Sequence, residues 1–212
     1  MSAIFCRQDK LEILSGEEFN RYCSEKNLHL YKILRGDLCH HNFCYNVGLN
    51  TLKDTFHPYG DCEWGGLYFC DHINVFHWLK LGTIIADVTI PDGAQVCLQK
   101  FGKYKCDQMI ISNLRKIDQS VIKMLVSSGS DIHVANEHAL LCALFDADYF
   151  RIKWLTEEGS DVNKMDHREL CSALRYLYNK GKQHCAVSKV FETACAEQNE
   201  KLRQKEESEK KE

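Results

Sequence analysis

Apolar residues recur three or four positions apart in two stretches of the second half of the chain. The two stripes are Val121, Ile122, Leu125 and Val126, and then Tyr149, Ile152 and Leu155. Residues at this spacing share one face of a helix, so each stripe predicts a helix with one buried side. A glycine closes each stripe, at Gly129 and at Gly159, where a left-handed helix cap is least costly.

The two stripes belong to an internal repeat. Residues 124–133 align with residues 154–163 at an offset of 30 positions. The identical pairs include Leu125 and Leu155, Gly129 and Gly159, Asp131 and Asp161, Leu140 and Leu170, Ala143 and Ala173, and Leu144 and Leu174. A shorter apolar helix is predicted at Ala139–Leu144 and again at Leu170–Leu177. The repeated unit is therefore a turn, a helix, a loop, a second helix and a glycine, which is typical of helical repeat proteins.

Residues 1 to about 112 show a different pattern of short strands and few helices. Ser15 and Glu18 form a capping-box pattern, which predicts a helix to about Ser24. Asp71 is predicted to cap a second helix carrying Ile73, Phe76 and Leu79. Alternating or β-branched positions predict strands at Leu30–Leu34, Phe43–Val47, Gly65–Cys70, Thr83–Ile90, Val96–Leu98 and Met109–Ile111. We therefore expect a small α+β domain here.

Composition narrows the class of protein. The formal net charge of the 212 residues is -3, whereas a general nucleic-acid binder usually carries a basic excess. The N-terminal residues lack the apolar core of a signal peptide, and no apolar run is long enough to span a membrane. We therefore expect an intracellular protein, with its 12 cysteines as reduced thiols.

The repeat endings carry a family resemblance. Leu125-Val-Ser-Ser-Gly-Ser-Asp-Ile-His133 and Leu155-Thr-Glu-Glu-Gly-Ser-Asp-Val-Asn163 resemble the ending of an ankyrin repeat. The usual Thr-Pro-Leu-His opening is absent, and Glu137–Leu140 and His167–Leu170 stand in its place. The offset is also shorter than the usual period of about 33 residues. The resemblance is to the divergent ankyrin-repeat proteins of giant, mimivirus-like DNA viruses of amoebae.

The first half also resembles a domain that precedes ankyrin repeats in those viral proteins. Three segments carry the likeness: Cys44–Asn50, Cys62–Phe69 and Ile84–Pro91. Together the two resemblances imply an α+β N-terminal domain at residues 1–112, followed by an all-α ankyrin-like helical repeat stack at residues 113–198. A degraded third unit is expected from Lys164 to about Ala196, and a charged, disordered tail at residues 199–212.

The resemblance implies a function and a set of contact residues. Stacked repeats bind partners through varied side chains at their turn tips, so we expect a non-enzymatic module that binds an unknown protein, without nucleic acid, membrane or cofactor. The positions that the resemblance assigns to protein binding are His133, Asn136, Glu137, His138, Asn163, Lys164, Asp166 and His167. No catalytic role is assigned to any residue.

Two alternatives of other classes stay open for residues 1–112. One is a zinc-stabilised domain using Cys39, Cys44, Cys62 and Cys70, although these spacings match no standard zinc knuckle. The other is an enzyme, for instance one with a Cys/His nucleophile, although no local signature selects a pair.

Two further segments, one with paired glycines and one rich in lysine, could also bind a ligand. Gly65-Gly66 precedes a predicted strand rather than a helix, which favours a tight turn over a phosphate cradle. Lys100-Phe-Gly-Lys-Tyr-Lys105 could contact RNA, and a solvated hairpin turn is the interpretation that we favour.

Overall fold

A computed structural model describes residues 13–40, 42–59 and 64–179. The chain divides into two compact units. The first, here called the sheet unit, comprises residues 1–75 and 82–115, and the second, the helical unit, comprises residues 76–81 and 116–212. The helical unit thus includes six residues from within the first half of the chain.

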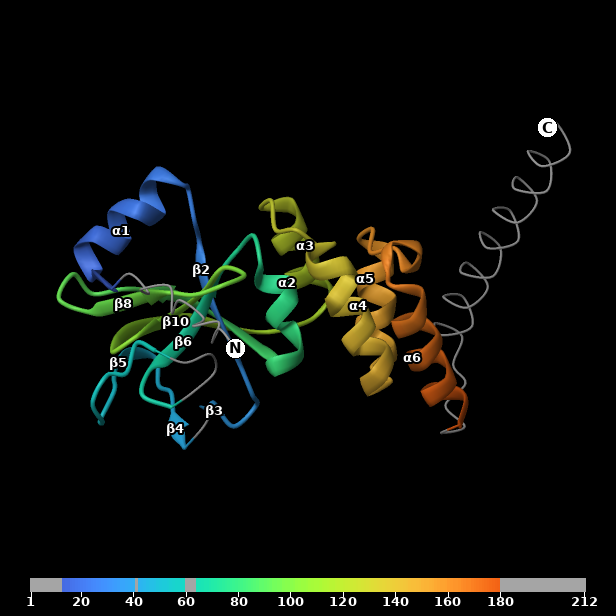
Figure 1. Ribbon diagram of the computed structural model, residues 1–212, viewed down its shortest axis with the longest axis horizontal. Helices are drawn as coiled ribbons and strands as arrows, with labels where there is room; N and C mark the ends of the chain where they lie inside the picture. Colours follow the sequence, from blue (N-terminus) through green and yellow to red (C-terminus); the bar gives the residue numbers. More distant parts are fainter. Residues whose placement is uncertain (1–12, 41, 60–63, 180–212) are drawn as a thin grey trace, which may run out of the picture. The chain divides into compact units, whose positions relative to one another are not determined.

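The strands of the sheet unit form one large antiparallel sheet and one small hairpin (Figure 1). In chain order the strands are β1 (Ile13–Ser15), β2 (Leu30–Leu34), β3 (Cys39–His40), β4 (Phe43–Cys44), β5 (Gly48–Thr51), β6 (Leu67–Asp71), β7 (Ile84–Thr89), β8 (Gln95–Leu98), β9 (Lys103–Cys106) and β10 (Gln108–Lys116). The eight-stranded sheet has the order β1-β8-β9-β6-β2-β7-β10-β5, and β3 pairs with β4 in the separate hairpin.

One helix, α1 (Gly16–Glu25), lies along a face of the sheet beside β8 (Figure 1). Ser15 caps it through its side chain, and Glu18 returns the bond to the Ser15 backbone, so the predicted capping box is present. Phe19 is fully buried, with its ring 5.0 Å from that of Tyr104 and 5.8 Å from that of Phe69. The aromatic contacts between α1, β6 and β9 are therefore the centre of the core of this unit.

The helical unit begins with the short segment α2 (Val75–Trp78) and the 3-10 turn η1 (Leu79–Leu81). It continues with α3 (Gln119–Ser127), α4 (Val134–Asp146), α5 (Tyr149–Glu157), the 3-10 turn η2 (Val162–Lys164) and α6 (His167–Asn179). The helix α4 packs against α5, α6, η1 and η2. Phe76 and Leu79 are fully buried, so the segment from the first half contributes core residues to this unit.

The predicted fold class is wrong. The dominant element is an eight-stranded antiparallel sheet that carries the ten-residue helix α1, and the described helices after it do not form an all-α ankyrin-like stack. The physical reason lies at the start of α4, where Ala135, Asn136 and Glu137 all have positive φ. Three left-handed residues in a row prevent a regular helix there. The expected third unit beyond residue 179 and the tail lie outside the described residues.

Some sequence predictions at the strand level also need correction. Of the predicted strand Phe43–Val47, only Phe43–Cys44 forms a strand, β4, and the next strand, β5, begins after the predicted range at Gly48, whose φ is +98°. The Lys100–Lys105 segment forms a turn and β9, but Lys103 and Lys105 are buried rather than solvated. In the helical unit, Cys142 is half-buried and Cys171 is exposed.

Candidate functional site

The two repeat endings have the same backbone geometry. Gly129 and Gly159 have φ values of +90° and +106°. The serine after each glycine donates its backbone N–H to a leucine carbonyl oxygen in the preceding helix. The distance is 3.0 Å from Ser130 to Leu125 and 2.9 Å from Ser160 to Leu155. The predicted glycine caps are thus confirmed, and the helix ends that they produce place equivalent turns 30 residues apart.

An aspartate organises each turn. The Asp131 carboxylate accepts the backbone N–H of His133 at 2.9 Å, and the Asp161 carboxylate accepts that of Asn163 at 3.0 Å. The Asn163 side chain also donates to Asp161, at 2.8 Å. These side-chain bonds imitate a backbone turn, so the direction of the chain after each helix is fixed locally.

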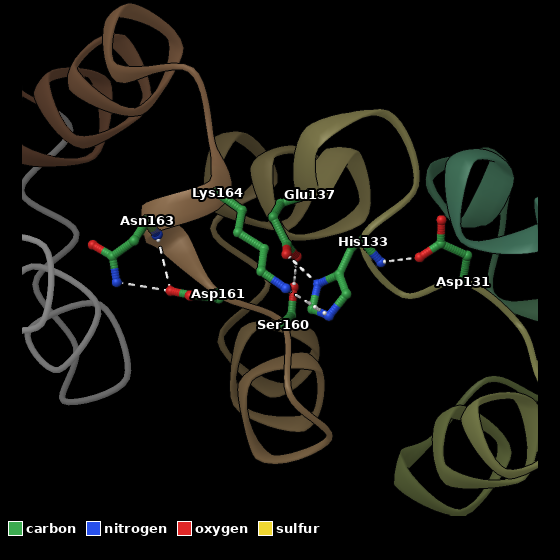
Figure 2. A network of polar contacts seen from close by, with 7 residues as sticks. All are labelled: Asp131, His133, Glu137, Ser160, Asp161, Asn163 and Lys164. Carbon is green, nitrogen blue, oxygen red and sulfur yellow. Dashed lines mark hydrogen bonds and ion pairs between the residues drawn. The ribbon is translucent and has the colours of Figure 1, made fainter.

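A chain of four polar side chains joins the two turns, and we name it the inter-repeat network: Lys164, His133, Glu137 and Ser160 (Figure 2). The Lys164 ammonium lies 3.1 Å from His133 Nε2. His133 Nδ1 contacts one Glu137 oxygen, and the Ser160 hydroxyl donates to the other. Residues from both repeat units therefore meet in one continuous set of bonds.

The two ring nitrogens of His133 face groups of opposite charge. Nδ1 faces the Glu137 carboxylate, which only accepts hydrogen bonds, and Nε2 faces the Lys164 ammonium, which only donates them. The imidazole ring is therefore oriented by a carboxylate on one side and a cation on the other.

Glu137 is the centre of the network, and its exposed fraction is 0 %. A buried carboxylate is tolerated only where its oxygens are hydrogen-bonded, and both oxygens of Glu137 are. The prediction of Glu137 as a protein-binding contact is therefore corrected, because its side chain does not reach the surface. Its role is to hold the two turns together.

The other predicted contact residues separate into two groups. Asn136, Lys164, Asp166 and His167 are exposed, while His133 and Asn163 are half-buried beside them. Asp166 also caps α6, accepting the N–H of Arg168 at 2.9 Å and that of Glu169 at 3.1 Å. We name the four exposed residues the rim; Lys164 belongs to both the rim and the network.

His138 makes its contacts with residues outside the network. Its ring stacks on that of His77, with centroids 4.5 Å apart, and its Nε2 is 3.4 Å from the Cys142 sulfur. Burial, with Lys80 and His77 nearby, lowers the pKa of His138 to about 4. Burial also raises the pKa of the Cys142 thiol. Both groups are neutral near pH 7, so this pair lacks the thiolate that a cysteine nucleophile requires.

Arg151 makes a buried polar contact in the helical unit that was not predicted from the sequence. Its side chain is buried, its Nη1 donates to the Leu79 carbonyl over 3.2 Å, and its Nε lies 3.5 Å from Asp148. It occupies the repeat position of Val121, on the apolar stripe. The presence of a charged residue at a position of the apolar stripe could have indicated this buried polar contact.

The cysteines proposed as zinc ligands do not form a site. Cys39 and Cys44 are joined in a disulfide, so the expectation of reduced thiols at these positions is also wrong. Cys70 is buried in β6 with its sulfur 3.5 Å from the Tyr31 carbonyl oxygen, and Cys62 lies outside the described residues. Across the described ranges, no group of three or more His, Cys, Asp or Glu side chains could hold a metal ion.

Comparison with known proteins points to amoebal giant viruses. A protein named "Putative ankyrin repeat protein R896", from Acanthamoeba polyphaga mimivirus, is 31% identical over 144 residues, which cover 65% of this chain and 43% of the relative. "Uncharacterized protein R869" from the same virus is 30% identical over 125 residues, which cover 56% of this chain and 91% of that relative. "Putative ankyrin repeat protein R229" is 29% identical over 149 residues, 66% of this chain and 47% of the relative.

This chain belongs to the mimivirus family of divergent ankyrin-repeat proteins. It spans less than half the length of the first of these relatives. No family model matches it, and no solved structure does. Among the described helices, none combines the length and the apolar character needed to cross a membrane.

Membership of the mimivirus ankyrin-repeat family agrees with the part of the repeat that is retained. The helix ending, its glycine and its aspartate turn recur in both units with the same bonds. The opening of the second helix differs, because the buried Glu137 and its left-handed neighbours occupy it in one unit and the 3-10 turn η2 precedes it in the other. The family relationship is thus visible in the helix endings rather than in a regular stack.

Proposed function

We propose that this chain is a non-enzymatic protein-interaction module that binds a protein partner through the rim residues Asn136, Lys164, Asp166 and His167. The observation that carries the proposal is the inter-repeat network, which holds two turns from different repeat units in one arrangement. A contact surface that is ordered before binding loses less entropy when the partner docks. The names of the family relatives, which refer to ankyrin repeats, support the same class of function.

The geometry of the network favours a structural role over catalysis. In a Ser-His-carboxylate arrangement the nucleophile faces the histidine nitrogen opposite the carboxylate. Here Lys164 stands at that nitrogen, and the Ser160 hydroxyl donates to Glu137 instead. The network contains the residue types of a catalytic triad, but its bonds connect the two turns instead of activating the serine.

The proposal includes the setting and the chemistry of the partner. We place the interaction in the host-cell cytoplasm, because the relatives are proteins of an amoebal virus. The partner is a protein rather than a nucleic acid or a membrane surface, since the rim combines amide, acidic and basic groups and carries no large excess of one charge.

The test is proximity labelling in amoebal cells with the full-length chain and with the double variant Lys164→Glu/His167→Glu. The matched control is Lys123→Glu, which reverses an exposed charge on α3. We expect specific neighbours to fall by about tenfold in the rim variant, as for loss of one interface hot spot, and to persist in the control. A rim variant that is folded and labels the same neighbours as the parent would refute the proposal.

A truncation would be a poorer test than these substitutions. Ending the chain after residue 115 would remove α3 to α6 and leave the fully buried Phe76 and Leu79 without their packing partners in the helical unit. Exposed apolar side chains of that size promote non-specific association. Substitutions at the exposed positions Lys164, His167 and Lys123 leave this packing intact.

A further inference from the structure

A disulfide crosses the small β3–β4 hairpin of the sheet unit. Cys39 and Cys44 are direct partners in the register of the two strands, and their sulfurs are bonded. Cys44 is exposed and Cys39 is half-buried. A small dithiol in solution can therefore reach this bond.

The free cysteines that the structure describes in the sheet unit are chemically different. Cys23, Cys70, Cys97 and Cys106 are all buried. Burial raises the pKa of each thiol, that of Cys23 to about 12. Since the thiolate is the reactive form, thiol exchange in the described part of this unit is concentrated at the Cys39–Cys44 hairpin.

The hairpin continues directly into a buried tyrosine. The Tyr45 backbone N–H donates to the Leu38 carbonyl oxygen at 2.9 Å, which is the bond adjacent to the disulfide. The Tyr45 ring is 4.7 Å from that of Phe43 and only 6 % of the residue is exposed. The disulfide and the adjacent backbone hydrogen bond thus join the two ends of the hairpin directly before Tyr45.

Tyr45 covers a buried lysine. The Lys32 ammonium lies 4.1 Å from the centroid of the Tyr45 ring and donates to the Tyr68 carbonyl oxygen at 2.5 Å. Only 5 % of Lys32 is exposed. Desolvation by burial is the main cause that lowers the pKa of Lys32 to about 8, while the nearby Cys106 and Cys70 act in the opposite sense. Part of the Lys32 amine population is therefore neutral near physiological pH, while the side chain stays buried.

We propose that the Cys39–Cys44 disulfide is a redox latch that keeps Tyr45 over Lys32, and that its reduction opens the cover and makes the Lys32 amine available for covalent modification by an acylating reagent. The reductant is a dithiol. The sulfur–sulfur bond between Cys39 and Cys44 breaks, a sulfur–sulfur bond forms within the reductant, and the two reductant protons pass to the cysteine sulfurs. After reduction, the hairpin is held by noncovalent contacts, the Leu38–Tyr45 hydrogen bond and the ring contacts, without the covalent cross-link.

The test measures acylation of individual lysines in the full-length chain. The oxidised protein and the protein treated with dithiothreitol are exposed to a limiting amount of an N-hydroxysuccinimide ester, and each lysine is quantified by peptide mapping. We expect the rate at Lys32 to rise by about tenfold on reduction, because breaking the cross-link removes a restraint on the unfolded hairpin and makes local opening more frequent. Lys53, which is exposed, gives the reference rate, and Lys105, whose exposed fraction is 0 %, reports opening of the whole unit.

Two variants separate the latch from other effects. Cys39→Ser/Cys44→Ser should label at Lys32 like the reduced protein and should not respond to dithiothreitol. Cys171→Ser, which removes an exposed free thiol in the helical unit, should behave like the parent chain. The proposal fails if Lys32 labelling is unchanged once the disulfide is open, if Lys105 rises together with Lys32, or if mild oxidation leaves Cys39 and Cys44 as free thiols.

Discussion

Lys32 makes the stability of the sheet unit depend on pH. Its pKa is about 8 in the folded chain, against an ordinary value of 10.5. Between these values the unfolded chain binds more protons than the folded chain, so this residue makes the free energy of unfolding increase as the pH rises from 8 to 10.5. The lowered pKa therefore corresponds to a destabilising contribution that is fully present below pH 8 and disappears at higher pH.

The measurement is the difference in unfolding free energy between the parent and Lys32→Met, by urea denaturation at pH 7 and pH 10. We expect the parent to gain about 2–3 kcal/mol relative to the variant over this interval, from a shift of that size at 1.36 kcal/mol per unit. The comparison with the variant is necessary because the raised pKa values of Tyr45 and Cys70 produce the opposite trend. A constant difference at the two pH values would show that Lys32 does not titrate in this range.

The buried charged residues were the part of the structure least accessible from sequence. The pattern Lys103-Tyr-Lys105 indicated a solvated turn, whereas Lys105 is fully buried and donates to the carbonyl oxygens of Tyr59 and Trp64. Glu137 was expected at the surface because the ankyrin resemblance assigns it to a protein-binding turn. A charged side chain is most often exposed, and the exceptions depend on partners from distant segments, which periodicity does not reveal.

At the scale of elements, the helix endings were the most predictable feature. A sequence with a glycine followed by Ser-Asp fixes its own local geometry, so the repeat endings and the α1 capping box could be identified from a few neighbouring residues. Strand β9 was missed because its two lysines hide the alternation of Tyr104 and Cys106, which face the core. The left-handed segment at the start of α4 had no local signal beyond the Asn136 that it contains.

The glycine endings allow a prediction at this scale. Replacing Gly159 with Ala should destabilise the helical unit by about 1–2 kcal/mol, because a Cβ is disfavoured at positive φ. The added methyl group would meet no atom within 4 Å, so the loss would come from the backbone conformation alone. The unfolding free energy in urea gives the size of the effect.

Gly93→Ala provides the matched control. This glycine also has open space where the alanine Cβ would lie, but it lacks a positive φ. Its replacement should leave the stability unchanged or raise it by up to about 1 kcal/mol, through the unfolded chain. Equal losses at Gly93 and Gly159 would contradict the assignment of the cost to the left-handed backbone.

At the scale of the whole molecule, the order of residues along the chain and the division into units do not coincide. The boundary near residue 112 was predicted from a change of pattern, and the structure divides the chain at 115/116 and also at 75/76 and 81/82. Sequence periodicity treats residues 71–81 as one helix of the first half. The assignment of residues 76–81 to the helical unit follows from contacts with α4 that are distant in sequence.

This division predicts that a substitution in the first half of the chain weakens the helices of the second half. Leu79 has an exposed fraction of 0 %, and its carbonyl accepts the Arg151 side chain of α5. Leu79→Ala should therefore lower the free energy of opening for α4 and α5 amides by about 2–4 kcal/mol, the usual cost of a buried leucine truncation. Amide hydrogen exchange resolves the two units, since the α1 and β2 amides of the sheet unit should be affected less.

Leu81→Ala, at a position that is 43% exposed, is the control and should leave α4 and α5 protected. If Leu79→Ala instead accelerated exchange in the sheet unit and spared α4 and α5, residues 76–81 would belong energetically with the strands that flank them in sequence.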